Sequence, residues 1–137
     1  TTTDGTYIGE YLAEPGDNTG HQSAHLILQD PTVEVAVLES ARGGILRSGL
    51  AFGSCDVGVV LNVAADHLGL GDIDTIDQMA RVKSVVAETV MPNGYAVLNA
   101  DDPLVSEMAS RVNGQIAYFS MNPECELIKT HTQKGGL

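Results

Sequence analysis

Polar side chains that could bind a metal ion or a nucleotide follow three apolar segments of the chain. "LESARGG" places Glu39 and Arg42 after the first segment, "LNVAADH" places Asn62 and His67 after the second, and "LNADD" places Asn99 after the third. A carboxylate and a neutral imidazole are suitable ligands for Mg²⁺ or Mn²⁺ when nucleotide phosphates complete the coordination shell. Glu39 and His67 together therefore favour a metal site.

Simpler interpretations compete with this one. Asp66 or Asp101, taken alone, is better explained as a helix N-cap than as a metal ligand. The histidines at positions 21, 25 and 67 show no zinc-ligand spacing. Arg42 and Arg47 flank a Gly-Gly pair that permits close backbone approach, so they could hold a phosphate or carboxylate, but Arg47 could equally be a solvated helix residue.

The elements that must position these residues form an α/β pattern. Continuous apolar, β-branched runs predict strands buried on both faces of an open, mainly parallel sheet, with helices between them. The predicted strands cover residues 33–39, 57–63, 95–100 and 115–120, and the predicted helices cover 76–90 and 103–111, with two more starting near Ser23 and Ile45. The carboxyl ends of parallel strands share one edge of the sheet, which is where ligands bind in such folds.

The helix predicted over residues 76–90 carries a lysine in an unusual position. Thr75 and Gln78 form a capping-box pattern at its start. At 100° per residue, Lys83 lies near the centre of the apolar stripe of this helix. Such a lysine must extend its amine to solvent, pair with an acid, or lose its charge. A neutral amine near a metal could take up CO₂ as a carbamate ligand, although extension to solvent is the commoner outcome.

Composition limits the class of protein. The chain has 137 residues, is 43% hydrophobic and carries a formal charge of −11, which argues against a nucleic-acid-binding surface but not against a nucleotide site. Two widely spaced cysteines suggest reduced thiols in a cytoplasmic protein, and no apolar run is long enough to span a membrane. We expect residues 1–22 to be irregular and residues 121–137 to form a terminal strand or tail.

Several motifs, in this order, resemble the central ATP-binding domain of the Mur ligase superfamily, which includes muramyl-peptide ligases and folylpolyglutamate synthases. The motifs are "TTTDGTYIGE", "LESARGGILRSGL", "LNVAADHLGLGDIDTI", "ARVKSVVAETV" and "GYAVLNADDPLV", and the likeness covers nearly the whole chain. The resemblance is greatest to members that add arginine to the β-carboxylate of aspartate on a growing polymer. It implies a truncated P-loop-type α/β domain that uses ATP and Mg²⁺.

The resemblance also implies a reaction and residue roles. ATP phosphorylates a carboxylate, and an amine attacks the acyl phosphate to give an amide, ADP and phosphate. Glu39 and His67 match the metal-binding residues, Asn62 arranges the loop that carries His67, and Lys83 matches a lysine that is carbamylated in several members. Two further residues are carried over as cofactor-binding: Asn99, near the adenine, and Arg42, where the acceptor approaches.

The sequence departs from the family pattern in one respect. It contains no Gly-Lys-Thr or Gly-Lys-Ser run, so we expect the phosphate-binding loop upstream of "TTTDG" and the carboxy-terminal domain to be missing. The isolated chain is then predicted to be inactive, and its raw sheet edge could promote self-association. The alternatives are another Mur-type ligase, a dinucleotide-dependent oxidoreductase, which would need a Gly-x-Gly-x-x-Gly turn, and a non-catalytic interaction module.

Overall fold

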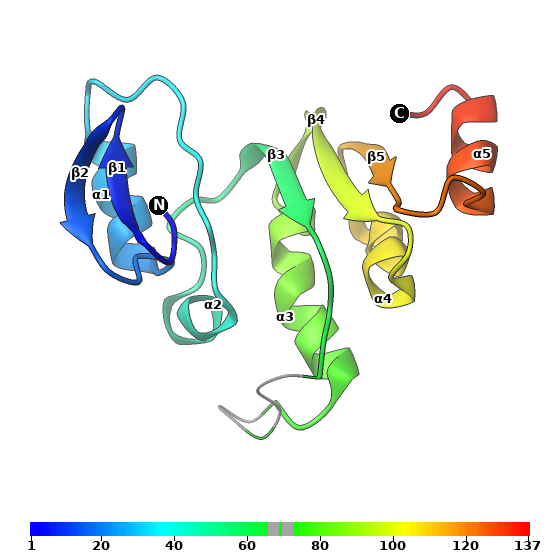
Figure 1. Cartoon of the computed structure of the whole chain (residues 1–137), viewed down its shortest axis with the longest axis horizontal. Helices are drawn as coiled ribbons and strands as arrows, with labels where there is room; N and C mark the ends of the chain where they lie inside the picture. Colours follow the sequence, from blue (N-terminus) through cyan, green and yellow to red (C-terminus); the bar gives the residue numbers. More distant parts are fainter. Residues whose placement is uncertain (66–68, 70–72) are drawn as a thin grey trace. The chain divides into compact units, whose positions relative to one another are not determined.

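The computed structural model describes residues 1–65, 69 and 73–137. The chain divides into two compact units, residues 1–53 and residues 54–137. Both are drawn in Figure 1, and each is described separately below.

The first unit contains a β-hairpin and two helices. Strands β1 (Gly5–Ile8) and β2 (Tyr11–Pro15) pair antiparallel where the sequence predicted an irregular segment. Helix α1 (His21–Gln29) follows and starts close to Ser23, as predicted, whereas helix α2 (Arg42–Ser48) starts three residues before the predicted Ile45. Gly44 is buried, and a Cβ there would lie 3.3 Å from the Cα of Gly20. Gly44 therefore does serve close backbone approach, whereas a Cβ on Gly43 would meet only the Arg47 side chain, at 3.8 Å.

The strand predicted over residues 33–39 is wrong. This segment has no assigned strand, and Val35 and Val37 are 81% and 80% exposed. Two backbone bonds join it to the chain start, where the Thr1 amine donates to the Val37 carbonyl over 2.8 Å and the Glu39 N–H donates to the Thr1 carbonyl over 3.0 Å. A strand needs a continuous hydrogen-bonded neighbour, and apolar composition alone does not supply one.

The second unit is built on a three-stranded parallel sheet, as the predicted α/β class requires. Its strands are β3 (Cys55–Val60), β4 (Val90–Asn99) and β5 (Gln115–Phe119), in the order β3-β4-β5. Helix α3 (Ile76–Glu88) connects the first two strands, and the short helix α4 (Pro103–Ser106) with the 3-10 helix η1 (Glu107–Arg111) connects the last two. Figure 1 shows α3 and α4 on the same side of the sheet.

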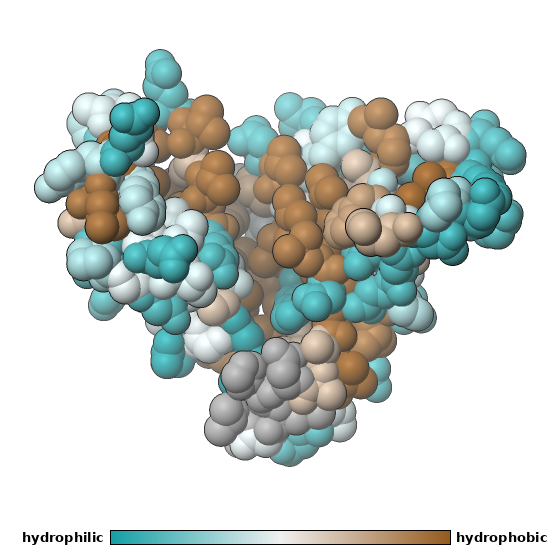
Figure 2. Space-filling model, in the orientation of Figure 1, coloured by the Kyte–Doolittle hydropathy of each residue, from teal (hydrophilic) through white to brown (hydrophobic). Residues whose placement is uncertain are grey.

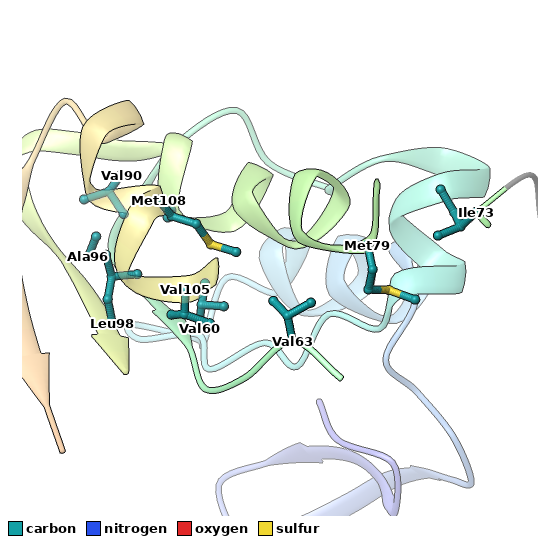
Figure 3. Close-up of a cluster of buried hydrophobic side chains, with 10 residues drawn as sticks. Val60, Val63, Ile73, Met79, Val90, Ala96, Leu98, Val105 and Met108 are labelled. Carbon is teal, nitrogen blue, oxygen red and sulfur yellow. The ribbon is translucent and has the colours of Figure 1, made fainter. Parts of the chain in front are cut away.

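A continuous aliphatic core lies between this sheet and its helices. Figure 3 shows valine, leucine, isoleucine, alanine and methionine side chains meeting there, without an aromatic ring among the buried members. The buried members are Val60, Val63, Ile73, Met79, Ala87, Val90, Ala96, Leu98, Val105 and Met108. The low aromatic content thus corresponds to an aliphatic core, as the composition indicates.

The opposite face of the sheet is apolar but exposed. Val57, Val59 and Leu61 are 55%, 49% and 62% exposed, and Figure 2 shows apolar surface over this part of the unit. The helices of the second unit cover one face of the sheet, so the predicted burial of both faces is not met within this unit. The reason is that a run of β-branched, apolar residues indicates a tendency to form a strand. It does not indicate which element covers that strand.

The end of the chain also differs from its prediction. Residues expected to form a strand or tail form helix α5 (Glu126–Gln133). The His131 ring meets the Tyr118 ring edge-on at a centroid distance of 4.9 Å, and its Nε2 lies 3.0 Å from the Ile116 carbonyl oxygen. In the described part of the chain, no helix has the length and apolarity needed to cross a membrane, and Cys55 and Cys125 are free thiols.

Candidate functional site

The carboxyl ends of β3, β4 and β5 lie at one edge of the parallel sheet, and polar side chains gather there. The pairing of Val60 with Leu98, and of Asn99 with Phe119, brings the three ends into register. The backbone then leaves β3 after Val60, and residues 61–65 are the last described residues before His67 in the sequence. The site is therefore assembled around the segment that follows β3.

Two predicted site residues, Lys83 and Asn99, bind the backbone that follows β3. The Lys83 amine donates to the Asn62 carbonyl over 2.9 Å, and the Asn99 amide donates to the Leu61 carbonyl over 2.9 Å. The side-chain oxygen of Asn99, Oδ1, in turn accepts from the Asp101 N–H over 2.9 Å. Lys83, Asn62 and Asn99 thus do lie together at the carboxyl end of the sheet.

The bond to Asn62 gives a partner to the lysine that the sequence places near the centre of the apolar stripe of helix α3. Lys83 is partly buried, and its amine reaches an exposed position where it donates to a backbone carbonyl. A cation so placed has a hydrogen-bond partner without any modification of the amine. Whether Lys83 forms a carbamate stays a prediction, because the bond to Asn62 accounts for the position of the amine and says nothing of CO₂.

The two aspartates of "NADD" have separate tasks. The Asp102 carboxylate caps helix α4, since Oδ1 accepts from the N–H groups of Leu104 and Val105, and its Oδ2 accepts from the Val63 N–H over 2.7 Å. Asp101, which sequence reasoning favoured as a helix cap, instead accepts from the Ser120 hydroxyl and the Met121 N–H, over 2.5 and 2.7 Å. The cap is therefore one residue later than expected.

Hydrogen bonding also sets the charge state of Asp101. The Ser120 hydroxyl, followed by the Met121 N–H, stabilises the carboxylate and holds the pKa of Asp101 below its ordinary value. Asp101 therefore stays ionised to a lower pH than an ordinary aspartate does. A carboxylate fixed in this way ties the end of β5 to the end of β4.

The predicted metal pair is described only in part. Glu39 belongs to the first unit, and its Oε2 accepts from the Thr3 N–H over 3.1 Å. His67 lies outside the described residues, so the convergence of Glu39 and His67 stays a prediction. Among the residues that are described, no three His, Cys, Asp or Glu side chains are grouped closely enough to bind a metal ion.

Arg42 is the first residue of helix α2 in the first unit, and Arg47 lies in its last turn. Their part in binding an acceptor or a phosphate likewise stays a prediction. Asp102 is the residue of this region that sequence reasoning did not select. Its signal was present, because an Asp immediately before a proline that starts a helix is typical of an N-cap. The second bond, to a backbone group 39 positions earlier, had no local signal.

Comparisons with known proteins identify the family. The family model for the Mur ligase middle domain matches residues 1–135. The chain is 74% identical over all 137 of its residues to "Cyanophycin synthetase" of Trichormus variabilis and to the protein of that name from Nostoc sp., and it spans 15% of the length of each. It is also 33% identical over 117 residues to a UDP-N-acetylmuramoyl-tripeptide–D-alanyl-D-alanine ligase of Mycobacterium leprae, covering 82% of this chain and 22% of that protein. The chain belongs to the Mur ligase family and corresponds to its middle domain.

Proposed function

We propose that this chain is the ATP- and Mg²⁺-binding middle domain of an ADP-forming amide ligase of the cyanophycin synthetase type. The observation that carries the proposal is the 69–74% identity to five cyanophycin synthetases, in each case over the whole chain. The parallel sheet supports it, because its strand ends present polar groups at the edge where such folds bind ligands.

The proposed reaction joins arginine to the β-carboxylate of an aspartate on a polymer. The carboxylate attacks the γ-phosphorus of ATP, the bond to the bridging oxygen breaks, and ADP leaves. The amine of arginine then attacks the acyl phosphate, releasing phosphate and a proton. Mg²⁺ would offset the negative charge that the phosphates develop during transfer.

We assign roles to the residues of this chain accordingly. Glu39 and His67 would hold the metal ion, since carboxylate oxygen and imidazole nitrogen suit Mg²⁺ once phosphate oxygens complete the shell. Asn62 would shape the loop that carries His67, and Asn99 would lie on the nucleotide side of the same edge. Arg42 would face the acceptor, and a carbamate on Lys83 would add an oxygen ligand.

The test uses a chimaera in which this chain replaces the matching stretch of the Nostoc sp. cyanophycin synthetase, to which it is 74% identical. We expect ADP release that requires both arginine and an aspartate-polymer primer. Glu39→Gln should lower this turnover by about a hundredfold or more, because the metal loses a charged ligand. The matched control is Glu34→Gln, an exposed residue of the same extended segment, which should keep full turnover.

Other outcomes identify the alternatives. Turnover with a different amino acid in place of arginine would assign another Mur-type ligase, a class represented by the muramoyl ligases that are 31–33% identical to this chain. Absence of Mg-ATP binding in the chimaera would favour a non-catalytic module and overturn the proposal. The isolated chain, which holds no Gly-Lys-Thr or Gly-Lys-Ser run, should release no ADP under the same conditions.

A further inference from the structure

Three successive residues after β3 are each held by a side chain from a different element. Asn99 at the end of β4 donates to the Leu61 carbonyl, Lys83 of α3 donates to the Asn62 carbonyl, and Asp102 before α4 accepts from the Val63 N–H. All three distances lie between 2.7 and 2.9 Å. We call these three side chains the backbone clamp.

The clamp replaces a sheet ladder that ends one residue earlier. The last pairing of β3 with β4 joins Val60 to Leu98, so residues 61–63 leave the ladder of β4. Backbone polar groups that leave a sheet need other partners, and here side chains supply them. The Val63 side chain is buried in the core, which adds an apolar anchor at the third clamped residue.

Asp102 is the member that links this segment to a second element. One carboxylate oxygen caps α4 and the other binds the Val63 N–H, so a single charged group joins the segment after β3 to the start of α4. Hydrogen bonds from backbone N–H groups to an ionised carboxylate are stronger than those between neutral groups. Asp102 is partly buried, which reduces competition from water.

We infer that Asp102 is a positioning residue, which fixes the backbone from which the chain proceeds toward His67. The inference rests on the proposed function in so far as His67 binds the metal of the ligase. Asp102 does not touch the ligand in this assignment. It acts through the course of residues 61–63, and Asn99 and Lys83 share that task.

The first experiment measures hydrogen exchange of the Val63 amide by NMR in the 137-residue chain. The Asp102→Asn side chain has one oxygen acceptor in place of two. That oxygen can accept from Val63 or from the first N–H groups of α4, and the NH₂ group, itself a donor, then faces the other N–H. We expect exchange at Val63 to rise by about tenfold, the size of a charge-assisted bond of about 1.4 kcal/mol. Asp101→Asn removes the same charge one position earlier and should leave Val63 protected.

A second variant distinguishes the loss of the Val63 bond from general unfolding. Asp102→Ser keeps a good N-cap for α4 but is too short to hold both partners, so Val63 should exchange faster while the β4 amides keep their protection. Unchanged exchange at Val63 in both variants would overturn the clamp.

The positioning role is tested in the chimaera through the Mg²⁺ dependence of ATP turnover. Asp102→Asn should raise the half-saturating Mg²⁺ concentration several-fold, with partial recovery at high Mg²⁺, whereas Asp101→Asn should not. A lower melting temperature with unchanged Mg²⁺ dependence would leave Asp102 as a structural residue and overturn the inference. If the unmutated chimaera fails to turn over ATP, the proposed function fails, while the exchange at Val63 still decides whether the clamp exists.

Discussion

At the scale of single residues, the edge of the parallel sheet is organised by side chains that bind backbone. Lys83, Asn99 and Asp102 bind three successive residues of one segment, and Asp101 binds the segment after β5. The types of these residues were informative in sequence, since a lysine near the centre of an apolar stripe and an "NADD" motif both stand out. Their partners were not, because those partners lie 20 to 39 positions away along the chain.

Asp101 gives a pH prediction at this scale. The Ser120 hydroxyl and then the Met121 N–H hold its pKa below the ordinary value. A carboxyl with a lowered pKa in the folded state adds stability above its unfolded pKa, and that stability is lost as the pH falls through the folded pKa. Ser120→Ala should therefore raise the pKa of Asp101 toward the ordinary value, measured by carbon NMR of the carboxyl group.

The control is Ser110→Ala, whose hydroxyl donates to the Glu107 carbonyl instead. It should leave the titration of Asp101 unaltered. An unchanged midpoint in Ser120→Ala would show that the Met121 N–H alone sets the pKa.

At the scale of elements, helix α3 is defined by its start and by its contact with β3. Thr75 Oγ1 accepts from the Gln78 N–H over 3.2 Å, and Gln78 Oε1 accepts from the Thr75 N–H over 3.0 Å. This capping box was predicted correctly because it depends on residues three positions apart. Thr75→Ala should lower the free energy of unfolding by about 1 kcal/mol in urea titrations.

Thr130→Ala, at an exposed position of α5, is the matched control for the cap and should alter stability by less than about 0.5 kcal/mol. Equal losses in the two variants would mean that the cap adds nothing beyond the properties of an exposed threonine.

The contact between α3 and β3 depends on a glycine. A Cβ on Gly58 would lie 2.7 Å from the Val86 carbonyl oxygen and 2.8 Å from a methyl group of Val90. Gly58→Ala should therefore push the helix from the sheet and destabilise the fold by about 1–3 kcal/mol, measured by urea unfolding. At Gly53 an added Cβ meets nothing within 4 Å, so Gly53→Ala should have little effect.

At the scale of the whole molecule, the two units differ in how much apolar surface each buries. All ten members of the buried aliphatic cluster belong to residues 54–137, whereas the buried hydrophobic residues of the first unit are Ala24 and Ile27. Small units with little buried apolar surface are marginally stable alone. Residues 54–137, expressed separately, should therefore retain a cooperative thermal transition.

Residues 1–53 alone should give the circular dichroism of a largely unfolded chain. The measurements are thermal melts and proton–nitrogen correlation spectra of the two pieces. A dispersed spectrum for 1–53, or a collapsed one for 54–137, would show that core size does not govern the stability of the units.

Features that depend on neighbouring residues and on residue pattern could be predicted from the amino-acid sequence. These are the α/β class, the order of β3, α3, β4 and β5, the capping box and the aliphatic core, although β3 ends at Val60 rather than at residue 63 and β4 begins at Val90 rather than at residue 95. Tertiary structure decided what depends on partners distant in the chain. The apolar run at 33–39 has no strand neighbour, Lys83 meets Asn62, and Asp102 rather than Asp101 holds a helix start. Local sequence pattern indicates a tendency to form a helix or a strand. Strand pairing and side-chain bonds to distant backbone groups require a second segment, and its position is set only when the chain folds.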